Sequence, residues 1–237
     1  MRCTLSVMSN SAKPSAGIIC AYCGAGAPQT NDHIPPKNLF SKPLPENLLT
    51  VPCCESCRRG WSKDDEYFRI ALLSSSNLAD VPAVQPAINS IFRSLRRPQA
   101  RGLAKLVESS IVEIEQRTKG GIIAGTAPAF KVQQPRLEQV GGRIIRALFF
   151  EEFKQPLPAT HVTRASIQQF GLDNLWPTIK EIPFAEPRSF AADLFHYTFA
   201  TVPEDPFSSI WLLDFFDRLP MVGYTLSATR NRIRHNG

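Results

Sequence analysis

The sequence has no apolar run long enough to cross a bilayer. Its longest apolar stretch, Ser209 to Phe216, is far shorter than the roughly 20 residues that a membrane-spanning helix needs. The segment from Met1 to Gly17 carries Arg2 and Lys13 but no continuous apolar core, so it does not resemble a secretory signal. We therefore expect a cytoplasmic protein in which residues 1–14 form a flexible leader.

Several common signatures of enzymes and repeat proteins are also missing. The sequence has no Gly-rich phosphate loop and no nucleophile elbow, so it gives no support to a P-loop nucleotide hydrolase or an α/β-hydrolase. It has no internal repeat and no low-complexity tract. Apolar residues make up 43% of the 237 residues, an ordinary fraction for a chain that buries a core.

Charged residues are few, but basic residues outnumber acidic ones. They make up 20% of the chain, and 27 Lys and Arg against 21 Asp and Glu give a formal net charge of +6 and a pI near 9.1. This excess favours an anionic partner, nucleic acid first and a membrane surface second. Many basic proteins bind no acidic partner, so the charge alone does not decide between these alternatives.

Apolar periodicity and turn residues predict an α+β fold. Helices are predicted over residues 64–73, 86–97, 100–116 and 137–153, and strands over 129–132, 192–202, 209–216 and 221–226. Ser62 is the expected N-cap of the first helix, with Asp65 three residues on as in a capping box. The last three strands, separated by turns, indicate an antiparallel meander. The expected organisation is a cysteine-rich module at 15–72, a helical region at 73–125 and an α+β region of unknown role at 126–237.

Cysteine is scarce but clustered, because five of the six cysteines lie between Cys20 and Cys57. The reducing cytosol argues against a disulfide framework, and the clustering predicts a metal site instead. Two C-x-x-C pairs supply four thiolates, which complete the tetrahedral site that zinc prefers. The predicted ligands of this structural zinc are Cys20, Cys23, Cys54 and Cys57. Cys53 could compete with Cys54, but the spacing favours Cys54. The alternative is four buried cysteines without a metal.

A second ordered motif lies between the two cysteine pairs. It reads D-H-I-P-P at residues 32–36 and N-L-L at residues 47–49. This order resembles the zinc-stabilised HNH endonuclease family over residues 20–69, which implies that the module at 15–72 is zinc-bound and HNH-like. The run from Val51 to Phe68 is similar to that of a bacterial HNH-like subgroup. The resemblance implies a β-hairpin followed by a helix, which together hold Mg²⁺ or Mn²⁺ and hydrolyse the phosphodiester bonds of DNA or another polynucleotide.

The resemblance also implies a role for each residue of the motif. His33 would be the general base that activates water, and Asp32 would ligate the divalent cation. Asn47 would orient the His33 imidazole through a hydrogen bond. The zinc would be fully coordinated and structural, in a module too small to have a large core of its own.

Arg58 departs from the family pattern, which places His or Asn directly after the second cysteine pair. A guanidinium stays protonated and offers no lone pair to a metal. Asp64 or Glu66 could supply the missing carboxylate, or Arg58 could contact the phosphate directly. The third possibility is that the cation has been lost. The alternative function is then a catalytically degenerate HNH-fold zinc module that binds nucleic acid or a protein partner without cleavage. A purely structural zinc knuckle serving the C-terminal meander is a further alternative.

The densest basic stretch surrounds the break at Pro98. Its members are Arg93, Arg96, Arg97, Arg101 and Lys105. These side chains could neutralise phosphates without regard to sequence, or they could form a solvated helix face. The aromatic residues beside the cysteines could stack on bases, but we expect at least two of them to pack the module against the helical region. They are Trp61, Tyr67 and Phe68.

Overall fold

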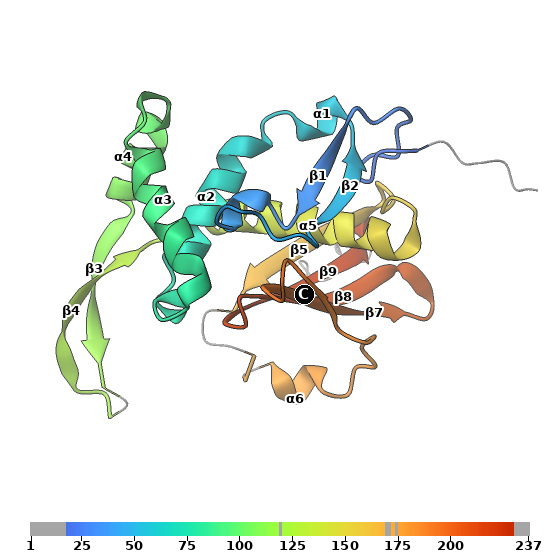
Figure 1. Cartoon of the computed structure of the whole chain (residues 1–237). Helices are drawn as coiled ribbons and strands as arrows, with labels where there is room; N and C mark the ends of the chain where they lie inside the picture. The colour runs from blue at the N-terminus through green and yellow to red at the C-terminus, as the bar shows by residue number, and fades with distance from the viewer. Residues whose placement is uncertain (1–17, 119, 169–171, 174, 230–237) are drawn as a thin grey trace, which may run out of the picture.

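The chain is organised around one long helix, α5 (Gln134–Phe153). Figure 1 shows this helix between the N-terminal elements on one side and a five-stranded antiparallel sheet on the other. This computed structural model describes residues 18–118, 120–168, 172–173 and 175–229. The leader predicted at residues 1–14, with Cys3, lies outside them. None of the described helices is long and apolar enough to cross a membrane.

The N-terminal elements begin with a β-hairpin. Strands β1 (Thr30–Ile34) and β2 (Leu49–Cys53) pair antiparallel, with His33 opposite Thr50. Successive residues of a strand point to opposite faces, so this register decides which side chains of the hairpin enter the core. Ile34 is completely buried, whereas the neighbouring His33 is only partly buried and reaches the surface.

Two helices follow the hairpin directly. They are α1 (Glu55–Arg58) and α2 (Trp61–Leu73). Helix α2 begins after Gly60, which has a φ of 90° and so adopts the left-handed conformation that glycine enters without strain. The predicted N-cap, Ser62, is therefore wrong, because it lies inside the first turn and no side chain caps this helix.

The middle of the chain is only partly helical. Helices α3 (Gln85–Leu95) and α4 (Arg101–Ser109) begin close to the predicted positions. The helix predicted over 100–116 is wrong beyond Ser109, because β3 (Ile111–Arg117) pairs there with β4 (Ile123–Phe130). The β-branched residues at the start of β3 favour this pairing. The β3–β4 hairpin projects away from the rest of the protein (Figure 1).

The C-terminal sheet has the strand order β5-β9-β8-β7-β6. Its strands are β5 (His161–Ile167), β6 (Arg188–Phe190), β7 (Phe195–Val202), β8 (Asp205–Phe215) and β9 (Leu219–Ser227). The predicted antiparallel meander is confirmed as β7-β8-β9. Strands β5 and β6 were not predicted. The short helix α6 (Trp176–Ile179) lies between them in sequence. The described part of the chain also contains four 3-10 turns: η1 (Lys37–Leu39), η2 (Ser76–Leu78), η3 (Pro82–Val84) and η4 (Pro98–Ala100).

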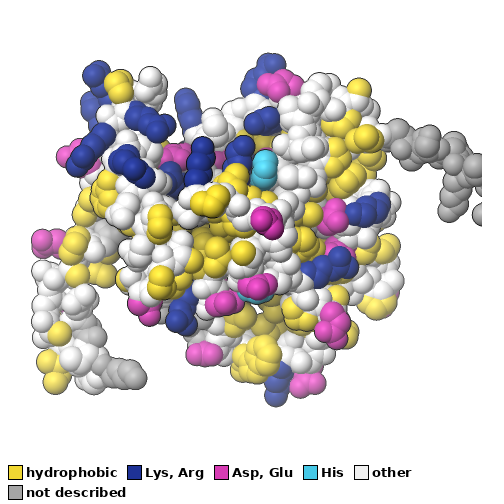
Figure 2. Space-filling model, viewed as in Figure 1, with side chains coloured by type: hydrophobic (Ala, Val, Ile, Leu, Met, Phe, Trp, Pro, Cys, Tyr) yellow, Lys and Arg dark blue, Asp and Glu magenta, His cyan; other side chains and the backbone are white. Residues whose placement is uncertain are grey.

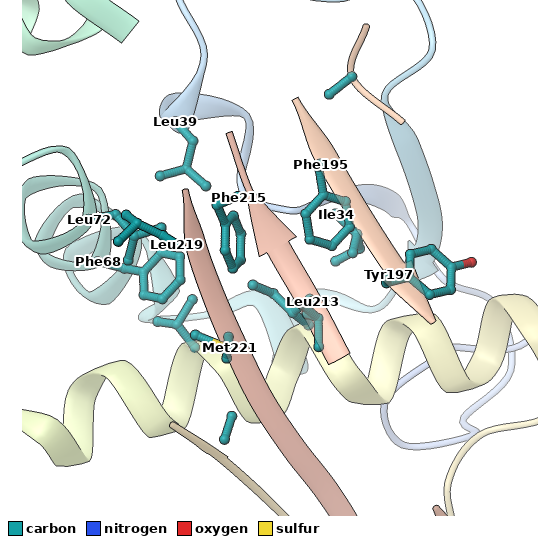
Figure 3. Packing of buried hydrophobic residues seen from close by; sticks show 14 of the residues in the cluster. Ile34, Leu39, Phe68, Leu72, Phe195, Tyr197, Leu213, Phe215, Leu219 and Met221 are labelled. Atoms are coloured by element: carbon teal, nitrogen blue, oxygen red, sulfur yellow. The ribbon is translucent and has the colours of Figure 1, made fainter. Parts of the chain in front are cut away.

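One hydrophobic core joins the N-terminal elements to α5 and the sheet. Figure 3 shows side chains from the hairpin region and α2, including Ile34, Leu39 and Phe68, facing residues of β7, β8 and β9. The rings of Phe68 and Phe215 meet edge-on, with their centroids 5.9 Å apart. Tyr67 and Phe68 are completely buried, and their ring partners lie on β4 and β8, outside the helical region predicted at 73–125. The β1–β2 hairpin is therefore held by a core that it shares with α5 and the C-terminal sheet.

Gly223 on β9 allows α5 to approach the sheet closely. A Cβ added there would overlap Cδ1 of Ile145 and lie 2.8 Å from the carbonyl oxygen of Arg164. We expect Gly223→Ala to lower the free energy of unfolding by about 1–3 kcal/mol, the usual cost of overpacking a tight core.

Chemical denaturation measures this effect, and Gly102→Ala on α4 is the matched control. No atom lies within 4 Å of a Cβ added at Gly102. Alanine is also favoured over glycine in a helix by about 1 kcal/mol. We therefore expect the control to be neutral or slightly stabilising. A Gly223→Ala protein as stable as wild type would contradict the close approach of α5 to β9.

Candidate metal centre and adjacent histidine pocket

Four cysteines form a compact cluster beside the β1–β2 hairpin. The Sγ atoms of the predicted ligands all lie within 4.8 Å of one another, and those of Cys23 and Cys54 are 3.7 Å apart. Within the described part of the chain, this is the only group of three or more His, Cys, Asp or Glu side chains that could hold a metal ion. The structure thus brings together Cys20, Cys23, Cys54 and Cys57, and this cluster can hold a metal ion.

Two backbone turns place these sulfurs. In the first, the N–H of Gly24 donates to the carbonyl oxygen of Cys20 at 2.9 Å, and Gly24 has a φ of 73°. In the second, Cys54 directly precedes α1, which carries Cys57. The N–H of Cys54 donates to Sγ of Cys20 at 3.4 Å, so the second turn also stabilises a thiolate on the first.

The thiols of the cluster differ strongly in acidity. A hydrogen bond with Ser56, 3.0 Å long, lowers the pKa of Cys54 to about 6. Burial raises the pKa of Cys57, and interactions with the neighbouring cysteine sulfurs raise it further. Neighbouring thiolates repel each other, and a bound cation removes that repulsion and favours deprotonation of all four thiols. Burial also raises the pKa of Cys53 to about 12, which keeps that thiol protonated.

A pocket of 640 Å³ lies between the hairpin, α1 and the start of α2. Its lining includes Asp32 and His33 from β1 and Arg58 from α1. Burial, followed by the positive charges of Lys37 and Arg58, lowers the pKa of His33, although Asp32 acts in the opposite direction. The imidazole is therefore neutral near pH 7, which is the form that can accept a proton.

Asp32 belongs to a network that the sequence pattern did not reveal. The hydroxyl of Tyr22 donates to Oδ2 of Asp32 at 2.5 Å, and Nε of Arg143 lies 4.0 Å from the same oxygen. Arg143 also forms an ion pair with Asp65 and stacks on the ring of Trp61, with its guanidinium carbon 4.4 Å from the ring centroid. The negative charge of Asp32 therefore lies close to the positive charge of the buried Arg143. Its other oxygen, Oδ1, makes no hydrogen bond within the described part of the chain.

Burial and the adjacent carboxylate keep Tyr22 in the form that donates this bond. Burial, and then the negative charge of Asp32, raise the pKa of Tyr22 well above its ordinary value. Burial likewise raises the pKa of Asp65, while its ion pair with Arg143 acts in the opposite direction. Arg143 is the one residue of this network that the sequence could have indicated, because its charged side chain interrupts the apolar side of the helix predicted over 137–153.

Two of the predicted site residues lie outside this pocket. Oδ1 of Asn47 accepts a hydrogen bond from the N–H of Ala192, 2.7 Å away and between β6 and β7. Oδ1 of Asp64 accepts from Nε of Arg136 at 2.8 Å. Neither Asn47 nor Asp64 is among the described residues that line the pocket. Glu66 does line it, but side chains of α2 and α3 already hold its carboxylate.

Basic side chains gather on the face that carries α1 to α4. Figure 2 shows Lys and Arg concentrated over these helices, in the upper part of the view. The four basic residues predicted to bind nucleic acid at the end of α3 and the start of α4 are all exposed: Arg93, Arg96, Arg97 and Arg101. Arg58 is separate from them and lines the histidine pocket. In comparisons with known proteins, no family model, no curated protein and no solved structure matches this chain.

Proposed function

We propose that this chain is an HNH-like endonuclease that hydrolyses phosphodiester bonds of DNA or another polynucleotide. One observation carries the proposal: β1 brings Asp32 and His33 into one pocket with Arg58, beside a cluster of four cysteines. The antiparallel pairing of β1 with β2, followed by α2, agrees with the hairpin and helix that the family resemblance implies.

We further infer that the four cysteines hold one structural zinc ion. A tetrahedral site with Zn–S bonds of about 2.3 Å places its sulfurs about 3.8 Å apart. The 3.7 Å between Sγ of Cys23 and Sγ of Cys54 supports this assignment. Four protein thiolates leave no open position on the ion, so the zinc would stabilise the fold and take no part in hydrolysis.

In the proposed reaction, His33 acts as the general base. The oxygen of a water molecule bonds to phosphorus, the bond from phosphorus to the leaving oxygen breaks, and His33 takes the proton from the water. The lowered pKa of His33 supports this role, because the imidazole is neutral before the reaction. Arg58 lines the same pocket and is suited to hold a phosphate oxygen, since a guanidinium donates several hydrogen bonds from a fixed plane.

The pocket can accept a divalent cation through Asp32. Mg²⁺ is commonly bound by one or two carboxylates, with waters and substrate phosphates completing its shell. Oδ1 of Asp32 is free of hydrogen bonds within the described part of the chain, while Asp64 and Glu66 are held by other side chains. When bound, the cation would stabilise the negative charge on the phosphate and the leaving oxygen.

The test is cleavage of supercoiled plasmid and of labelled DNA and RNA oligonucleotides, both single-stranded and double-stranded. With added Mg²⁺ or Mn²⁺ we expect cleavage that EDTA abolishes and that His33→Ala lacks. If no substrate is cleaved with any cation, or if the variant cleaves as well as wild type, the proposal is wrong.

Binding without cleavage is a second candidate function, and Arg58 and Arg143 favour it. Arg58 lines the pocket and the Arg143 guanidinium lies 4.0 Å from Asp32, so both place permanent positive charge near the carboxylate that would hold the cation. Like charges repel, and each of these arginines weakens cation binding. A site with this charge balance could hold a phosphate without cleaving it.

Arg58→Asn separates the two functions, because Asn is a residue that the family carries at this position. For a nuclease that uses Arg58 on phosphate, we expect polynucleotide binding to weaken about tenfold, since a charged hydrogen bond contributes about 1.5 kcal/mol. Fluorescence anisotropy and the cleavage assay measure both properties. Arg58→Lys is the matched control, because it keeps the charge and should keep most of the affinity. Cleavage that appears only in Arg58→Asn would identify the natural protein as a binding module.

A further inference from the structure

A second pocket adjoins the histidine pocket. It measures 830 Å³, lies between α2, α3 and the start of α4, and shares Ser62 and Glu66 with the first pocket. Its polar lining consists mainly of hydroxyl and basic side chains, and Glu66 is the single carboxylate among the described lining residues. The basic members are Lys63, Arg69, Arg97 and Arg136.

The positive charge of this second pocket is only partly compensated. Arg136 forms an ion pair with Asp64 at 2.7 Å, and Arg69 forms one with Glu66 at 3.0 Å. Lys63 and Arg97 are exposed, and neither makes an ion pair with any residue in the described part of the chain. Their charges therefore create a positive potential at the mouth of the pocket, which attracts an anion.

Arg69 adds a buried donor whose capacity the protein leaves partly unused. It lines the second pocket and is only 6% exposed. One terminal nitrogen donates to the carbonyl oxygen of Ala87 at 2.9 Å, while Nε is buried without a partner among the described residues. The terminal nitrogens are held by Glu66, Ser90 and the carbonyl oxygen of Ala87, so Arg69 contributes a fixed positive charge to the wall of the pocket.

We propose that this second pocket is a phosphate subsite that binds a backbone phosphate flanking the one held beside His33. The inference rests on the proposed function, because it places one polynucleotide across both pockets. Ser62 and Glu66, which line both pockets, mark where the strand would pass from one to the other. Lys63 and Arg97 would contact phosphate oxygens, and such contacts position a strand without reading its sequence. The helices that line this pocket, α2 to α4, lie on the face where Figure 2 shows Lys and Arg gathered.

The experiment measures binding in a His33→Ala background, so that the probe stays intact. The dissociation constants of a labelled single strand and a labelled duplex are measured by fluorescence anisotropy over a range of salt concentrations. The test protein carries Lys63→Ala and Arg97→Ala. The matched control carries Arg164→Ala and Lys180→Ala, which remove the same charge from residues that line neither pocket.

Loss of two phosphate contacts should reduce the slope of log affinity against log salt by about 1.4 for a single strand and about 1.8 for a duplex. The control should keep the slope of the His33→Ala parent protein. Binding with an unchanged slope in the test protein, or an equal change in the control, would overturn the subsite and leave the proposed function standing. Absence of binding by all three proteins at low salt would overturn both.

Discussion

Cys57→Ser is expected to release the proposed zinc ion and to lower the thermal midpoint by about 10 °C or more. Serine keeps the size of the side chain but is a neutral hydroxyl at pH 7, whereas zinc needs a deprotonated ligand. Structural zinc contributes about 10–16 kcal/mol to small zinc-dependent domains, and even a third of that free energy produces a shift of this size in a chain of this length. Removal of the metal from wild type with a chelator should reproduce both changes.

Cys53→Ser is the matched control for this loss. Cys53 is completely buried next to Cys54, but its Sγ donates to the carbonyl oxygen of Cys54 at 3.4 Å and lies outside the cluster of four. We expect this variant to retain one metal ion per chain, measured by mass spectrometry of the protein-bound metal, and to show a much smaller shift in a calorimetric scan. Metal retained by Cys57→Ser, or lost from Cys53→Ser, would contradict the four-ligand assignment.

The size of the stability loss depends on how the hairpin is held. Ile34 from β1 and Phe68 from α2 are completely buried in the core that they share with the C-terminal sheet. Burying such side chains contributes about 1.5–3 kcal/mol each, and this contribution remains when the metal is removed. Hydrogen exchange should therefore increase first around residues 20–26 and 54–58, while α5 and β8 remain protected.

The elements that could be predicted from the sequence have nearby partners, but a nearby partner was not sufficient, because β3 and β6 also pair with the next strand in the chain and were not predicted. The meander β7-β8-β9 was predicted because each strand pairs with its neighbour in sequence, and the helix at 137–153 because its own apolar spacing defines it. Strand β5 pairs with β9, which lies far along the chain, so no local pattern indicates that pairing. The prediction of a helix through residue 116 was wrong, because the spacing of the β-branched residues there is compatible with a helix as well as with a strand.

The candidate site shows the same division. The cluster of four cysteines could be predicted because two short, locally defined turns carry it, and Asp32 and His33 are adjacent on one strand. The partners of Asp32 could not be predicted in full, because Arg143 arrives from α5 on the other side of the core. The same holds for Asn47, whose hydrogen bond to Ala192 depends on how β6 and β7 dock against the segment after η1.

His33→Ala is expected to reduce the rate of polynucleotide cleavage by about 10²–10⁴-fold, the usual contribution of a general base. The change should leave the fold and the bound metal intact, because His33 is only partly buried and lies outside the cysteine cluster. Single-turnover cleavage with excess enzyme measures the chemical step directly, so that a change in product release does not hide the effect.

His196→Ala is the control for this experiment. His196 lies on β7, where its Nε2 is 3.0 Å from Asp217, and it does not line the histidine pocket. The control should cleave at the wild-type rate. Wild-type binding by His33→Ala, with cleavage lost, would assign the histidine to the chemical step, because a residue that mainly binds substrate would change affinity as well. If both histidine variants lost activity together, the loss would reflect the fold, and the assignment of His33 as the base would be wrong.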